Sequence, residues 1–176
     1  MQKTMKLFII ITLTILILGI VIYLFQKNKT SEKSDSIKAR DQNKKVYIID
    51  GKKFNTLQGF YDEISLKVIP GNEWGQNLDA FNDILRGGFG TPDEGFIIKW
   101  VNSDISRKQL GVDLTILHKL ELMKKCHPSN ISFIENQIKD LKNGKGKTLF
   151  EELVSIIQMH GPKGDEQESN VDLILE

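Results

Sequence analysis

Two aspartates, Asp79 and Asp83, are the residues whose types and spacing could do chemistry in this 176-residue chain. They lie four apart in EWGQNLDAFNDIL, residues 73–85. On a helix, this spacing sets two carboxylates side by side on one face. They could act as an acid–base pair, as in glycoside hydrolases, but such pairs normally come from separate elements that flank a cleft. Otherwise they present negative charge to a cationic partner, or are simply solvated.

The segment around the two aspartates has the signals of a short helix. Asn77 is a good N-cap, because its side chain can accept the free N–H groups of the first turn. Leu78, Phe81 and Leu85 then recur at helical spacing and predict one apolar face. The two carboxylates should therefore point away from the core.

Other candidate sites have weaker patterns. Cys126 and His127 are sequence neighbours, whereas a catalytic Cys/His pair is brought together by the fold. His118 lies among leucines, and the few histidines and the single cysteine give zinc no ligand cluster. The sequence GKGKT, residues 144–148, lacks the earlier glycine of a phosphate loop. We expect no metal, no cofactor and no catalytic residue.

The first 44 residues differ from the rest. After a tail, 1–6, the run 7–25 holds nineteen residues without a charge, which matches the thickness of a bilayer. It predicts one retained transmembrane helix rather than a signal peptide, since no small-residue cleavage motif follows. Residues 26–44 are polar and predict a flexible linker. Their lysines favour a cytoplasmic location for the part that follows.

The charge distribution excludes one class of partner. Residues 1–45 hold nine Lys or Arg against three Asp or Glu, and residues 46–176 hold fifteen against twenty. The predicted globular domain, 45–176, is therefore mildly acidic, whereas nucleic-acid binding needs a basic surface. We expect no direct nucleic-acid binding, and a basic protein partner fits better.

Strands and helices alternate along this domain. Apolar runs predict strands over 46–50, 95–102 and 170–176, the second of them buried on both faces. Helical periodicity and capping residues predict helices within 55–71, 77–86, 112–126, 131–146 and 147–164. Right-handed crossovers between such strands imply parallel pairing. The expected fold is α/β, a three-stranded parallel sheet covered by helices.

The stretch from residue 46 to residue 90 resembles the barstar family of inhibitors of the bacterial ribonuclease barnase. The shared pattern is a strand ending in Ile-Asp-Gly, a helix, then Trp-Gly-x-Asn-Leu-Asp-Ala, a second aspartate and a glycine. The resemblance implies a non-enzymatic inhibitor whose second helix enters the ribonuclease active site. Its implied ribonuclease-binding residues are Trp74, Gly75, Asn77, Asp79, Asn82, Asp83 and Gly87.

The sequence also departs from the family pattern. Glu73, Asn82 and Gly88 stand where aromatic residues are expected, Met159 stands near an expected acid, and residues 103–147 look like an insertion. These departures imply a target other than barnase itself. We therefore expect a membrane-tethered immunity protein against a basic ribonuclease or nuclease toxin. The alternatives are a membrane-anchored interaction module without a nuclease target and, more remotely, a small hydrolase.

Overall fold

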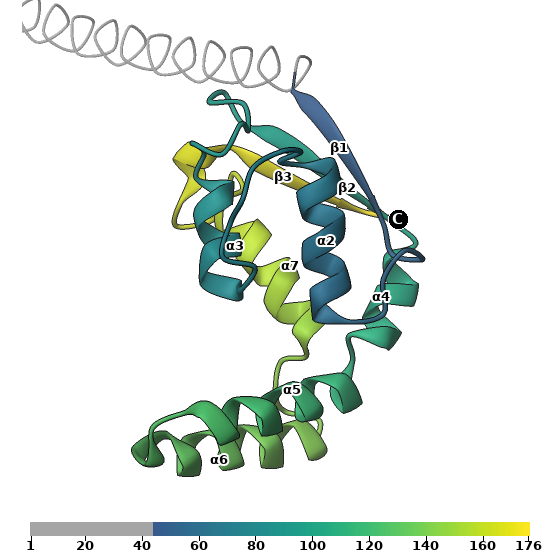
Figure 1. Ribbon diagram of the computed structural model, residues 1–176. Coiled ribbons are helices and arrows are strands. Elements are labelled where there is room, and N and C mark those ends of the chain that lie inside the picture. Colours follow the sequence, from purple (N-terminus) through teal and green to yellow (C-terminus); the bar gives the residue numbers. More distant parts are fainter. Residues whose placement is uncertain (1–43) are drawn as a thin grey trace, which may run out of the picture. The chain divides into compact units, whose positions relative to one another are not determined.

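Three parallel strands form the sheet in a computed structural model, which describes residues 44–176 (Figure 1). β1 (Lys45–Asp50), β2 (Phe96–Val101) and β3 (Val171–Leu175) lie in that order. Ile49 pairs with Trp100, which pairs with Leu175. The predicted parallel sheet is confirmed.

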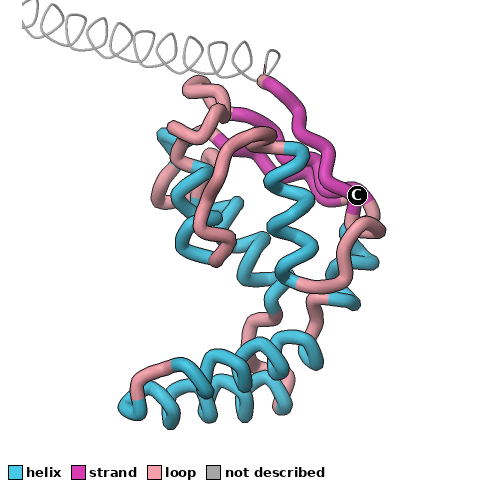
Figure 2. The backbone as a smooth tube through the Cα atoms, in the orientation of Figure 1, coloured by secondary structure: helices cyan, strands magenta, loops and turns pink. Residues whose placement is uncertain are grey.

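Helices cover one face of this sheet. α2 (Leu57–Lys67), α3 (Leu78–Leu85) and α7 (Leu149–Met159) pack there (Figures 1 and 2). The strands contribute Tyr47, Ile49, Phe96, Ile98, Trp100 and Val171 to the core. Right-handed crossovers between successive neighbours all fall on the same side of a sheet, which explains why these helices lie together.

The other face of the sheet is not covered within residues 44–176. Val46 and Ile48 are about half exposed there, and Lys99 forms an ion pair with Glu176 at 2.9 Å. In β2 itself, buried residues alternate with partly exposed ones, so the prediction that the strand at 95–102 is buried on both faces is wrong. A run of β-branched residues suits a strand whether one face or both are covered, so the apolar run alone could not decide.

Capping residues fix the ends of the covering helices. Thr56 accepts a hydrogen bond from the Gly59 N–H at 3.0 Å and begins α2. Thr148 and Glu151 form a reciprocal capping box at the start of α7, an arrangement that satisfies N–H groups left free in the first turn. The core between these helices is aromatic, with Phe60 stacked on Trp100 at a centroid distance of 5.2 Å.

Between β2 and α7 the chain forms three helices. α4 (Ser103–Gln109) packs on the body, where buried Ser106 accepts a hydrogen bond from Trp100 Nε1 at 3.0 Å. α5 (Val112–Lys125) and α6 (Ile131–Lys142), joined by the 3-10 turn η1 (Pro128–Asn130), form a hairpin set apart from the sheet (Figure 1). A second 3-10 turn, η2 (Gln167–Ser169), precedes β3. The insertion expected at 103–147 stays a prediction.

The predicted tail, transmembrane helix and linker lie outside the described residues, apart from residue 44. Lys44 is buried and donates a hydrogen bond to Asn170 Oδ1 at 2.8 Å, which ties the start of β1 to β3. Within residues 44–176 no helix has both the length and the apolar character needed to cross a bilayer.

Candidate functional site

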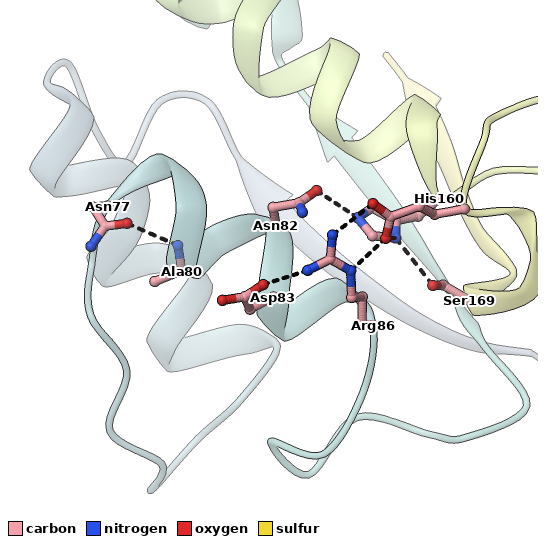
Figure 3. Close-up of polar contacts among 8 residues, drawn as sticks. Asn77, Ala80, Asn82, Asp83, Arg86, His160 and Ser169 are labelled. Atoms are coloured by element: carbon pink, nitrogen blue, oxygen red, sulfur yellow. Dashed lines mark hydrogen bonds and ion pairs between the residues drawn. The ribbon is translucent and has the colours of Figure 1, made fainter.

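Helix α3 carries both aspartates on its exposed side. Its N-cap, Asn77, accepts a hydrogen bond from the Ala80 N–H at 2.8 Å (Figure 3). Phe81, Ile84 and Leu85 are completely or almost completely buried, and they fix which face of the helix meets the core. Asp79 and Asp83 are exposed as a consequence, as the apolar spacing predicts.

The loop before α3 is held by side chains that were predicted to bind a ribonuclease. Trp74 is half-buried, and its Nε1 donates a hydrogen bond to Ser65 Oγ at 2.7 Å. Its ring packs edge-on against Tyr61 at 5.2 Å between centroids. Asn77 also donates to the Gly75 carbonyl at 3.2 Å. Trp74 and Asn77 therefore position the loop and the helix through contacts within the chain.

The arginine that follows α3 contacts the second aspartate. Arg86 donates from one guanidinium nitrogen to Asp83 Oδ1, and from two others to Glu166, the second of these at 2.7 Å (Figure 3). The hydrogen bond from Arg86 holds the pKa of the Glu166 carboxyl below its ordinary value. Asp83 keeps 56% of its side chain exposed. One oxygen of Asp83 is therefore engaged, while the carboxylate stays at the surface.

Acidic groups outnumber this arginine at the C-terminal end of α3. A shallow cleft of about 280 Å³ follows the helix and is lined by Arg86, Asp93, Glu166 and Glu168. Gly87, also in its lining, has a φ of +105°, a left-handed conformation that glycine adopts without a steric penalty. The turn at Gly87 thus brings the loop of Asp93 beside the acids that precede β3. The local charge is negative despite Arg86.

The side chain of Asn82 contacts α7. Its Oδ1 lies 2.9 Å from Nε2 of His160, whose Nδ1 lies 3.1 Å from Ser169 Oγ (Figure 3). His160 is completely buried at the end of α7. An Nε2–H that donates to Asn82, with Nδ1 accepting from Ser169, satisfies the neutral ring. Asn82 therefore links α3 to α7.

The buried His160 predicts weaker folding in acid. Burial lowers its pKa, and Arg86 lowers it further, while Glu166 and Glu168 oppose the shift. The unfolded chain, in which histidine titrates near 6.5, then binds more protons than the folded chain as the pH falls below that value. The free energy of unfolding must decrease with falling pH in this window and level off below the folded pKa.

Urea unfolding at a series of pH values measures this effect. We expect His160→Gln to reduce the loss of unfolding free energy between about pH 7 and pH 5. The matched control is His127→Gln, because His127 is an exposed histidine whose side-chain hydrogen bonds are to Ser129 in its own loop. An unchanged pH dependence in His160→Gln contradicts the burial argument.

The seven predicted ribonuclease-binding residues lie in one region of the structure, but they make different kinds of contact. Asp79 and Asp83 are presented outward, Trp74, Asn77 and Asn82 make contacts within the chain, and Gly75 and Gly87 shape the flanking loops. Arg86, Asp93, Glu166 and Glu168 were missed. The signal for Arg86 was its place three residues after Asp83. Glu166 lies 80 residues further on, so no local pattern could reveal its ion pair.

Cys126, His127 and residues 144–148 lie outside this acidic site. Within residues 44–176 no group of three or more His, Cys, Asp or Glu is placed to hold a metal ion. Cys126 carries a free thiol, and His127 bonds to Ser129 at 2.8 Å instead of to Cys126. Residues 144–148 form the turn between α6 and α7.

The segment that contains α3 matches a known protein family. Residues 44–126 match the family model Barstar, described as barstar (barnase inhibitor). The match supports a place in the barstar family, whose members are inhibitors rather than enzymes. It covers β1 through α5 and includes the whole of α3. No curated protein matches the chain.

Proposed function

We propose that this protein is the immunity protein of a small basic ribonuclease and blocks the enzyme by placing α3 in its active site. The observation that supports this most strongly is the exposure of Asp79 and Asp83 on one capped helix, inside a segment that matches the barstar family model. Ribonuclease active sites are cationic because they bind phosphate. Two carboxylates on a rigid helix can occupy the positions of phosphate groups.

The electrostatics of the site favour a cationic partner. Asp83, Asp93, Glu166 and Glu168 surround a single arginine at the end of α3. A surface of one sign attracts a partner of the opposite sign from a distance and raises the association rate. Arg86 already neutralises part of Asp83, so the enzyme's basic groups compete with Arg86 for this carboxylate. The repulsion between the two aspartates would be relieved in the complex.

The arrangement does not favour the hydrolase interpretation. Both carboxylates belong to one helix, and one oxygen of Asp83 is held by Arg86. A glycoside hydrolase places its two carboxyl groups on opposite sides of the bond to be cleaved. The two aspartates therefore lack the geometry for that reaction, and their exposure suits recognition.

The proposal is tested by ribonuclease inhibition. Purified full-length chain in mild detergent is titrated against barnase and against the small basic ribonucleases that its host exports or encodes beside it. We expect stoichiometric loss of RNA cleavage by at least one of these enzymes. If none is inhibited while the chain is folded, the proposal is wrong, and an interaction module without a nuclease target becomes the better account.

We also propose that residues 7–25 anchor the protein in the membrane as a single pass, with the inhibitory part in the cytoplasm. The support is the nineteen-residue uncharged run and the basic residues that follow it. We expect the full chain to stay with membranes after alkaline carbonate washing, and a chain without residues 1–43 to be released. Release of the full chain would contradict the anchor, and protease accessibility in spheroplasts tests the orientation.

Arg86 should weaken the attraction of the site for a cationic enzyme. Replacing Arg86 with glutamine removes one positive charge beside Asp83 and frees the bound oxygen. We expect faster association, by about two- to tenfold at low salt, and a difference that shrinks as salt is added. Stopped-flow kinetics measures it, with Lys67→Gln on α2 as the control. Slower association of the Arg86 variant would instead show that Arg86 positions Asp83 for binding.

A further inference from the structure

A second cleft, of about 300 Å³, lies beside Asp79 at the start of α3. Its walls come from three helices. α2 contributes Leu57 and Tyr61, α3 contributes Leu78 and Asp79, and α5 contributes His118 and Leu122. The α5–α6 hairpin therefore reaches the predicted binding surface, although it lies apart from the sheet (Figure 1).

One residue that lines this cleft has a buried polar atom without a partner. Tyr61 is only 3% exposed, and its hydroxyl makes no hydrogen bond to any residue between 44 and 176. Leaving such a group unpaired costs about 1–3 kcal/mol. Burial raises the pKa of Tyr61, and the charges of Glu152 and Asp79 raise it further, so the hydroxyl stays protonated.

The chemistry of the lining suits a long cationic side chain. Leu57, Leu78 and Leu122 offer an apolar wall to an aliphatic stem. The Asp79 carboxylate is exposed and has no hydrogen-bond or ion-pair partner within the described residues. The Tyr61 hydroxyl is closed to solvent in the free protein, and its oxygen can accept an N–H once a side chain of the lining moves aside. An arginine has five donors in a fixed fork and can serve both acceptors at once. Burial lowers the pKa of His118, so its ring is neutral at pH 7 and does not repel a cation.

The apolar surface continues from this cleft along the hairpin. Leu122 also lines a neighbouring cleft together with Phe133 and Ile134 of α6. Phe133 is 63% exposed, and Leu117 on α5 is similarly exposed. Exposed apolar side chains next to a charged site are typical of interaction surfaces.

We infer that the α5–α6 hairpin is a second contact surface for the ribonuclease, and that the cleft between α5 and α3 receives an arginine side chain of that enzyme. This inference rests on the proposed function and extends it, because it assigns binding to residues of α2 and α5 outside the acidic face of α3. The hairpin then selects among basic ribonucleases according to whether they carry a basic side chain at this position.

Two matched pairs of variants of the full-length chain test the inference. Tyr61→Phe removes the unpaired hydroxyl of the cleft, and Tyr47→Phe removes the hydroxyl of another buried tyrosine that is also unpaired but lies on β1. Leu122→Ala removes the cleft wall on α5, and Leu120→Ala shortens a leucine of similar exposure that does not line the cleft. Binding is measured by calorimetry with barnase and with each enzyme that the inhibition assay identifies, alongside Asp83→Asn.

We expect Tyr61→Phe and Leu122→Ala each to weaken binding by about tenfold, with unchanged urea unfolding for Tyr61→Phe and unchanged binding for both controls. Normal binding by both cleft variants, with loss of binding in Asp83→Asn, overturns the inference and leaves the proposed function standing. If the two control variants lose as much affinity as the cleft variants, the inference is also overturned, because the loss would then not depend on residues that line the cleft. Absence of wild-type binding to every enzyme contradicts the proposed function and the inference together.

Discussion

Replacing Asp83 with asparagine is expected to raise the Kd for the target ribonuclease by about 30-fold to several thousandfold. The change keeps the shape of the side chain and removes its charge. In the complex, the carboxylate would be buried against basic groups, and removing one member of a buried charged pair costs about 2–5 kcal/mol, a range that draws in part on the barnase–barstar complex. Asp79→Asn should weaken binding in the same direction. Calorimetry or surface plasmon resonance at a fixed salt concentration measures both.

The control for this prediction is Asp104→Asn. Asp104, like Asp79, is an exposed residue in the first turn of a helix. Each substitution therefore removes a similar favourable interaction with the helix dipole, so the two variants should unfold at similar urea concentrations. Only the α3 variants should lose affinity, and raising the salt should slow association of the wild type. Equal affinity in all three variants would contradict the role assigned to α3.

Replacing Phe60 with alanine is expected to lower the free energy of unfolding by about 3–5 kcal/mol, the range for a large aromatic residue in a core. Phe60 is completely buried on α2 and contacts the rings of Phe54, Phe81 and Trp100. Alanine would leave a cavity between α2, α3 and β2 that these neighbours could fill only in part. Because Phe81 fixes the buried face of α3, the variant should also hold the two aspartates less firmly.

Phe133→Ala is the matched control for Phe60→Ala. Phe133 is also a helical phenylalanine but is 63% exposed, so its removal should change the unfolding free energy by about 0.5 kcal/mol or less. Urea unfolding followed by circular dichroism compares the two variants. Similar losses in both would contradict the placement of the core between the sheet and α2, α3 and α7.

Local signals account for most of the fold that sequence analysis predicted. Asn77 caps α3 as expected, and α2 and α7 begin within the segments that were predicted to be helical. Successive strands that are connected by such helices then pair in parallel. The helix α4 was missed because its buried residues are Ser103 and Ser106, which do not appear in a search for apolar periodicity. Ser106 is buried because it accepts a hydrogen bond from Trp100, 6 residues away.

The site was predictable only in part. The outward direction of Asp79 and Asp83 follows from Phe81 and Leu85 on the same helix. The ion pair of Arg86 with Glu166 and the cleft beside α5 depend on segments distant in sequence, and no spacing rule reaches them. The inward contact of Asn82 with His160 also spans 78 residues. Three predicted binding residues, Trp74, Asn77 and Asn82, therefore make contacts within the chain that only the fold reveals.

The central claim is that the acidic face of α3 occupies the phosphate-binding site of a ribonuclease. Steady-state cleavage of a short RNA substrate at several inhibitor concentrations, with and without a mononucleotide bound in the enzyme's active site, tests this most directly. The account predicts purely competitive inhibition, with displacement of the nucleotide by the wild-type protein and not by the Asp79→Asn, Asp83→Asn double variant. Inhibition that leaves the nucleotide bound, or that survives in the double variant, would contradict it.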